Sequence, residues 1–139
     1  MSSHMHTVQY YETDKMGITH HSNYIRFMEE ARMHLLAEMG FPMTRFEEAG
    51  IVSPVVSVHC DYKHSTTFCD AIAIDAKITG YTGARISLEY TMTNEKTGDI
   101  VANAASTHCF TDKTGRPLAL RKIFPELDGQ LKEAVKILS

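Results

Sequence analysis

The chain has 139 residues, of which 43% are apolar and 22% are charged, and its formal net charge at pH 7 is −3. This composition is typical of a single soluble domain whose hydrophobic core needs no disulfides or structural metal. The slightly acidic balance argues against a protein that mainly binds nucleic acid or an anionic membrane, because such proteins carry basic patches.

The beginning of the chain gives no sign of export or of membrane insertion. It lacks the apolar core of a secretory signal, and no run in the sequence approaches the roughly 18 apolar residues of a membrane span, so we expect a cytoplasmic protein. Residues 1–5 could be native, disordered or derived from cloning, and they are set aside from functional reasoning. Residues 6–12 are predicted to form a first strand.

Residues 22–39 are predicted to form one long amphipathic helix. Apolar side chains recur there at steps of three and four residues, which places them on one face. The other face is expected to lie in solvent, with Glu29 and Glu30 paired to Arg26 or Arg32.

After residue 50 the pattern changes to alternation of apolar and polar residues, which predicts strands. Four are expected, near residues 56–62, 72–78, 86–92 and 100–110, joined by short turns as in an antiparallel meander, and a weaker helix is expected over 127–138. A sheet of five strands is wider than one helix, so it must curl and leave an edge for a second subunit. The predicted fold class is α+β, a long central helix wrapped by a curved antiparallel sheet of five or more strands.

The connection between the first strand and the long helix contains most of the chemically active side chains. Asp14 would lie just before a helix N-terminus, beside free backbone N–H groups and the positive end of the helix dipole, which favour its carboxylate form. The same amides could hold an oxyanion, so the stretch could form a minimal acyl-transfer site without a metal. Gly17 would let the loop approach a ligand closely. An ordinary turn or capping role for Asp14 is the alternative.

The spacing of these residues resembles a known family signature. The residues that carry it are Tyr11, Thr13, Asp14, Gly17, His21, Tyr24, Glu29, Ala31 and Arg32, with further matches at Tyr62, Asp70, Asp112, Gly115, Arg116 and Pro117. They are similar to the hotdog-fold acyl-CoA thioesterases of the 4-hydroxybenzoyl-CoA type, including the Tol-Pal-associated branch, over about residues 6–121. The chain departs from that pattern at Thr19, His20 and Ser65.

The resemblance implies a single hotdog thioesterase domain over residues 1–139 that needs no cofactor. It implies that Asp14 is the catalytic carboxylate, acting as nucleophile or general base, and that a helix-start amide near His21 polarises the thioester carbonyl. Tyr24, Met16 and Gly17 are further candidates for contact with the acyl group. For Tyr24 and Met16 a plain packing role is the alternative. For His21 itself, a hydrogen-bonding role in the site and a plain capping or packing role are both open.

Histidines and cysteines give no metal template. His20 and His21 are adjacent without a carboxylate at ligand spacing, so no metal is expected, and the remaining candidates His59, His64 and His108 are expected within strands. The three cysteines have no CxxC spacing and are expected to be reduced and mostly buried: Cys60, Cys69 and Cys109.

Two functions therefore compete. The first is hydrolysis of an acyl-CoA thioester to free acid and CoA, and the second is a non-catalytic module on the same fold that binds acyl-CoA or an acyl carrier. Asp14 favours the first, because a binding module needs no carboxylate beside an oxyanion site. A dehydratase of the same fold ranks last, since its usual acid/base setting is missing. The expected partners are an acyl-CoA substrate and other copies of the chain, in a homodimer that assembles into a homotetramer, with no nucleic acid or membrane.

Overall fold

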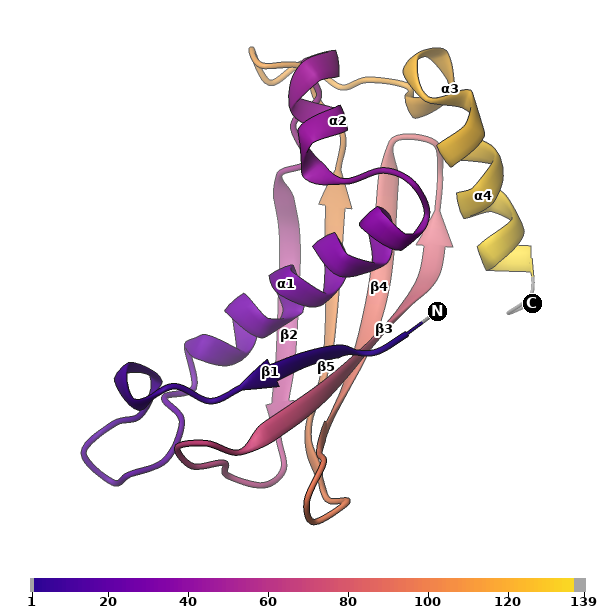
Figure 1. Cartoon of the computed structure of the whole chain (residues 1–139). Helices are drawn as coiled ribbons and strands as arrows, with labels where there is room; N and C mark the ends of the chain where they lie inside the picture. The colour runs from indigo at the N-terminus through magenta and orange to yellow at the C-terminus, as the bar shows by residue number, and fades with distance from the viewer. Residues whose placement is uncertain (1, 137–139) are drawn as a thin grey trace. The chain divides into compact units, whose positions relative to one another are not determined.

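The computed structural model describes residues 2–136 and has a five-stranded antiparallel sheet with the strand order β1-β3-β4-β5-β2 (Figure 1). The strands are β1 (His4–Thr7), β2 (Val55–Tyr62), β3 (Ala71–Tyr81), β4 (Arg85–Asn94) and β5 (Ile100–Cys109). The helices are α1 (Asn23–Glu38), α2 (Met43–Ala49), α3 (Leu120–Ile123) and α4 (Pro125–Lys136), with a 3-10 turn η1 (Tyr10–Glu12). The predicted α+β class and the four long strands are confirmed. None of the described helices is long and apolar enough to cross a membrane.

Contacts between residues divide the chain into two compact units. The described part of unit 1 comprises residues 2–35, 59–76 and 90–104, and that of unit 2 comprises residues 36–58, 77–89 and 105–136. Helix α1 and strands β2 to β5 each begin in one unit and end in the other. The single domain over residues 1–139 stays a prediction.

Strand β1 differs from the prediction of a strand over residues 6–12. It pairs with β3 in antiparallel register, with His4 opposite Ile74, and it ends at Thr7 (Figure 1). The chain then turns into η1, because the Glu12 carboxylate accepts the N–H of Gln9 at 2.8 Å. Part of the segment set aside as disordered or cloning-derived is thus a paired strand, while Met1 lies outside the described residues.

Helix α1 confirms the predicted helix to within one residue at each end, and in unit 1 its apolar face is buried: Tyr24, Phe27, Met28, Ala31 and Leu35. The expectation that Arg32 lies in solvent is wrong, because its side chain is only 4% exposed. Burial lowers the pKa of this guanidinium, and the nearby Tyr90 and Glu29 partly offset that effect. Glu30 contacts two histidines of β1 rather than an arginine, with its Oε1 3.2 Å from His4 Nε2.

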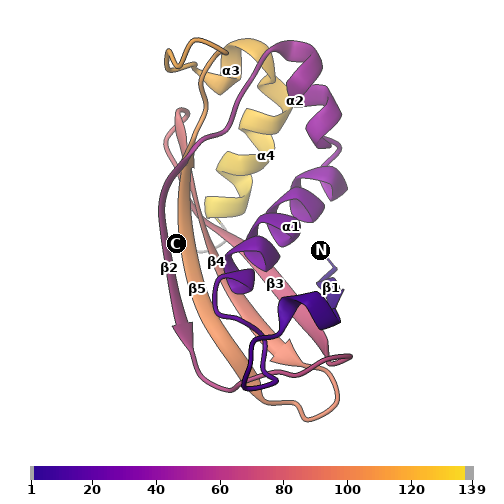
Figure 2. The same ribbon diagram turned by 90° about the vertical axis from the view of Figure 1, so that its left-hand side faces the viewer.

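Unit 2 contains a helix that the sequence pattern did not predict. Helix α2 follows Pro42 and ends at Gly50, whose φ of 72° is the left-handed conformation that commonly closes a helix. Its Phe46 is buried and packs against Phe110 and Phe124, at centroid distances of 6.3 and 5.5 Å. Phe124 is the residue between α3 and α4, so this aromatic packing holds α2 near the junction of those two helices (Figure 2).

Helix α4 begins at Pro125, two residues before the start of the helix predicted over 127–138, and is described as far as Lys136. Residues 137 and 138 lie outside the described residues. Its Asp128 accepts a hydrogen bond from the Tyr81 hydroxyl at 2.5 Å and pairs with Lys132 Nζ at 2.8 Å. Lys132 and then Tyr81 hold the pKa of the Asp128 carboxyl below its usual range. Burial, followed by the bond to Asp128, raises the pKa of the Tyr81 phenol.

Strand β2 lies at one edge of the sheet and is exposed along most of its length. Its apolar side chains Val55, Val56 and Val58, in unit 2, are each more than 40% exposed. The three cysteines are free thiols, but the expectation that they are mostly buried is wrong, since Cys69 is exposed and Cys60 and Cys109 are half-buried. Cys60 lies on the edge strand β2, Cys69 lies in the connection between β2 and β3, and Cys109 is the last residue of β5.

Candidate active site

The loop between η1 and α1 folds back on itself in a tight turn. Thr13 and Thr19 form an antiparallel bridge, the Asp14 amide donates to the Ile18 carbonyl at 2.9 Å, and the Gly17 amide donates to the Asp14 carbonyl at 3.0 Å. Gly17 has a φ of +80°, in the region that favours glycine. The turn therefore accounts for Gly17 on backbone grounds, independently of any ligand.

Asp14 is half-buried in this turn, and the turn orients its side chain. Oδ1 accepts the backbone N–H of Met16 at 2.8 Å, whereas Oδ2 has no hydrogen-bond donor within residues 2–136. Oδ1 is thus held by a hydrogen bond, and Oδ2 is free to accept one from a ligand or water. Such a carboxylate can accept a proton or attack an electrophile without first losing a protein contact.

Glu12 fixes both ends of the loop. Its carbonyl oxygen accepts the His20 amide at 2.8 Å and the Asn23 side-chain amide at 2.9 Å. Its buried carboxylate accepts His6 Nε2 at 2.8 Å as well as the N–H of Gln9. The start of helix α1 is therefore tied through one residue to η1 and to strand β1.

The first amides around the start of α1 differ in whether they already have an acceptor. The Ser22 N–H donates to His20 Nδ1 at 3.2 Å, the Asn23 N–H to the His20 carbonyl at 3.0 Å, and the Tyr24 N–H to the His21 carbonyl at 3.3 Å. The N–H of His21 has no acceptor among the described residues. It is a free donor at the positive end of the helix dipole, which is where an anionic oxygen is stabilised.

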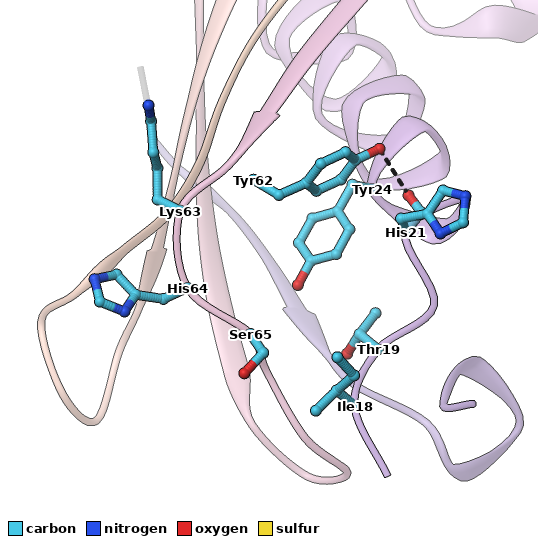
Figure 3. A pocket seen from close by; sticks show the side chains of 8 residues that line it. All are labelled: Ile18, Thr19, His21, Tyr24, Tyr62, Lys63, His64 and Ser65. Atoms are coloured by element: carbon cyan, nitrogen blue, oxygen red, sulfur yellow. Dashed lines mark hydrogen bonds between the residues drawn. The ribbon is translucent and has the colours of Figure 1, made fainter. Parts of the chain in front are cut away.

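A pocket of about 190 Å³ lies beside this helix start. It is lined from two stretches of unit 1, by Ile18, Thr19, His21, Tyr24, Tyr62, Lys63, His64 and Ser65 (Figure 3). The rings of Tyr24 and Tyr62 meet edge to face, with centroids 5.3 Å apart. Figure 3 shows the Tyr24 hydroxyl directed toward Thr19 and Ser65, whereas the Lys63 side chain points away from them.

Three buried hydroxyl groups form a chain at this pocket. The Thr66 Oγ1 lies 3.0 Å from the Tyr24 hydroxyl and 2.6 Å from the Thr19 Oγ1, and the Thr66 carbonyl accepts the Thr19 amide at 2.8 Å. Burial raises the pKa of the Tyr24 phenol, and the bonds to Thr66 and Thr19 partly offset this. Tyr24 therefore presents a neutral hydroxyl whose direction Thr66 sets.

The structure brings together only some of the residues that the sequence predicted for the site. His21 and Tyr24 line the pocket, whereas Asp14, Met16 and Gly17 do not, and the Met16 side chain is 77% exposed. The roles predicted for these five residues remain untested by this arrangement.

Sequence reasoning missed other residues of the pocket. In the sequence, Thr19 and Ser65 stand out only as departures from the family pattern, and no role in the site is predicted for Tyr62. The same holds for Thr66, which bonds to Tyr24 and Thr19 but does not itself line the pocket. His64 lies in the loop after β2, not in a strand as predicted. No group of three or more His, Cys, Asp or Glu side chains in the described part of the chain is arranged to hold a metal ion.

Comparisons with known proteins agree with one another. Residues 8–135 match the family model described as the thioesterase-like superfamily. YneP of Bacillus subtilis, named as a candidate acyl-CoA thioesterase, is 33% identical over 130 residues, which cover 93% of this chain and 94% of YneP. The long-chain acyl-CoA thioesterase FadM of Escherichia coli is 28% identical, over 93% of this chain and 96% of FadM. The crystal structure of a DHNA-CoA thioesterase from Staphylococcus aureus matches with a TM-score of 0.91 and 28% identity, covering 99% of this chain and 91% of that one.

Proposed function

The chain belongs to the thioesterase-like superfamily, and we propose on that premise that it hydrolyses an acyl-CoA thioester to a free acid and CoA. Its hotdog fold is confirmed by its likeness to the Staphylococcus aureus thioesterase. The observation that supports the proposal lies in the connection between η1 and α1. There the Asp14 carboxylate has one oxygen that accepts no hydrogen bond from residues 2–136, and the His21 N–H at the helix start has no acceptor among them.

In the proposed mechanism, Asp14 Oδ2 acts on the thioester in one of two ways. It attacks the carbonyl carbon, so that the C–S bond breaks, CoA thiolate leaves, and water opens the resulting anhydride. Alternatively, it takes a proton from the water that attacks the carbonyl, and the C–S bond then breaks in the same sense. In both routes the carbonyl oxygen gains negative charge, which the His21 N–H and the helix dipole stabilise.

Tyr24 is proposed as a wall of the acyl site, with Met16 and Gly17 contacting the substrate from the loop. The pocket of about 190 Å³ suits a small acyl group, with the Tyr24 and Tyr62 rings as its apolar part. Because Asp14, Met16 and Gly17 lie outside the lining of this pocket, we propose that a second copy of the chain completes the site and that acyl chains run between α1 and that copy.

The proposed assembly is a homodimer that pairs further into a homotetramer. Strand β2 supports it, because an edge strand with exposed backbone groups and exposed Val56 and Val58 side chains is suited to pairing with another chain. The cytoplasmic location and the Tol-Pal-associated branch remain predictions of the sequence.

A non-catalytic module that binds acyl-CoA or an acyl carrier is the second candidate. It is favoured by the separation of Asp14 from the lining of the pocket. The test is release of free thiol from short-chain, long-chain and aromatic acyl-CoAs, measured with a thiol-reactive dye alongside binding of the same compounds by calorimetry. Turnover of at least one compound is expected. Binding without turnover of any of them would refute hydrolysis and support the binding module.

A further inference from the structure

We propose that Tyr62 is a positioning residue that holds the helix start at which the thioester carbonyl is polarised. The proposal rests on the proposed function, and it assigns to Tyr62 a role that acts through His21 and not through contact with the reacting atoms. Tyr62 is the last residue of β2, whereas His21 lies in the turn before α1. The two residues are 41 positions apart in the sequence.

The first support is a hydrogen bond to the backbone. The Tyr62 hydroxyl donates to the His21 carbonyl oxygen at 3.1 Å, and the same oxygen accepts the Tyr24 N–H at 3.3 Å (Figure 3). This carbonyl is therefore held from the strand as well as from the helix. Fixing it restricts rotation of the His21 backbone, and that backbone carries the N–H without an acceptor.

The second support is the packing of the Tyr62 ring. It meets the His21 ring at 6.2 Å and 81° and the Tyr24 ring at 5.3 Å and 73°, and both contacts are edge to face. Edge-to-face contacts are favourable and directional for aromatic rings. The ring is thus oriented by two neighbours, and its hydroxyl is directed at the His21 carbonyl.

The third support is the exposure of the turn before α1 and the local character of the contacts within it. Residues 20–22 are exposed, and their contacts with one another are a stack of the His20 and His21 rings at 4.3 Å, a bond that the Ser22 N–H donates to His20 Nδ1, and a contact of the same nitrogen with the Ser22 hydroxyl. Such contacts move with the turn. The His20 N–H also donates to the Glu12 carbonyl at 2.8 Å, which ties the turn to η1, whereas His21 is held from outside the turn and α1 by Tyr62 alone among the described residues. Because a misplacement of about 1 Å at a reacting centre can cost a factor of about 100 in rate, a link from this turn to β2 has a catalytic consequence.

The experiment is Tyr62→Phe, which keeps the ring and removes the hydroxyl. We expect kcat for thiol release to fall by a factor of about 5 to 10, as for loss of one hydrogen bond, with KM changed by less than about twofold. Because the Tyr62 side chain is 48% exposed, the melting temperature should change by less than about 2 °C. Tyr81→Phe is the matched control, since it also removes a tyrosine hydroxyl bond but in unit 2, and its kcat should equal that of the wild type.

A second measurement is independent of turnover. Amide hydrogen exchange at Ser22 and Tyr24, whose N–H groups donate to His20 Nδ1 and to the His21 carbonyl, is followed by NMR in the whole protein and should be several-fold faster in Tyr62→Phe than in the wild type or in Tyr81→Phe. Unchanged exchange, unchanged kcat, or a rise in KM alone would each overturn the positioning role. A wild type that releases no thiol would refute the proposed function instead, and the exchange data would still decide whether Tyr62 holds the turn.

Discussion

Replacing Asp14 by Asn tests the proposed chemistry while leaving the loop intact. An asparagine side chain keeps an oxygen that can accept the Met16 N–H, now at 2.8 Å from Oδ1. The bonds of the Asp14 N–H and C=O to Ile18 and Gly17 belong to the backbone and are unaffected by the change. We therefore expect the free energy of unfolding to change by less than about 0.5 kcal/mol.

The effect on catalysis should be much larger. An amide neither accepts the proton of an attacking water nor forms an anhydride, and a positioned proton acceptor contributes about a hundredfold to ten-thousandfold in rate. A fall in kcat of at least about a hundredfold is expected for Asp14→Asn, which corresponds to about 2.7 kcal/mol in activation free energy. KM should change little, because the group acts mainly in the transition state.

The assay is thiol release at saturating acyl-CoA, with thermal unfolding measured on the same samples. Asp75→Asn is the matched control, because it makes the same chemical change at an exposed position of β3 and should leave kcat unaltered. An Asp14→Asn variant that keeps more than about a tenth of wild-type kcat would contradict the reasoning, since a residual rate of that size is too high for loss of the main proton acceptor.

Three further results are expected. Thr66→Val should lower the free energy of unfolding by about 1 to 3 kcal/mol in urea titrations, because the buried Tyr24 hydroxyl loses its bond to Thr66. Thr66→Ser keeps a hydroxyl and should lower the free energy of unfolding by less. Equal stability of Thr66→Val and the wild type would contradict this. The Asp128 pKa is lowered in the folded state, mainly by Lys132. This carboxylate therefore stabilises the fold above about pH 4, and its contribution is lost as the pH falls through the lowered pKa. The melting temperatures of the wild type and Asp128→Asn should differ at pH 6 and converge toward pH 2. Val58→Glu should have a lower molar mass than the wild type in light scattering, because it places a charge on the exposed edge strand β2. An unchanged molar mass would argue against assembly through β2.

Periodicity was enough to predict α1 and the four long strands. Helix α1 and strands β3, β4 and β5 bury one side, whereas β2 alternates in sequence but is exposed along most of its length. It failed where a few tertiary contacts decide the structure. Helix α2 has only seven residues, and the packing of Phe46 against Phe110 and Phe124 holds it in place. The charge of Arg32 favours solvent, but Arg32 lies four residues after Met28 and three before Leu35, which are both buried, and so shares their face of α1.

The site was only partly accessible to sequence reasoning for a similar reason. His21 and Tyr24 stand out because they precede or begin a helix, and both line the pocket. Thr66 and Tyr62 could not be found in this way, because their hydroxyl groups act on residues 41 to 47 positions away in the sequence. No local pattern encodes such a contact, and a turn threonine or strand tyrosine is usual in any sheet protein.

The walls of the pocket have a consequence for protein engineering. Every side chain that lines it comes from one of two short stretches, residues 18–24 and 62–65. A combinatorial library confined to these stretches could retune the range of accepted acyl groups while leaving the remaining strands and helices unmutated. Laboratory evolution of this scaffold therefore has a small search space, best centred on the exposed Lys63, His64 and Ser65, because Thr19 and Tyr24 are buried and joined through Thr66.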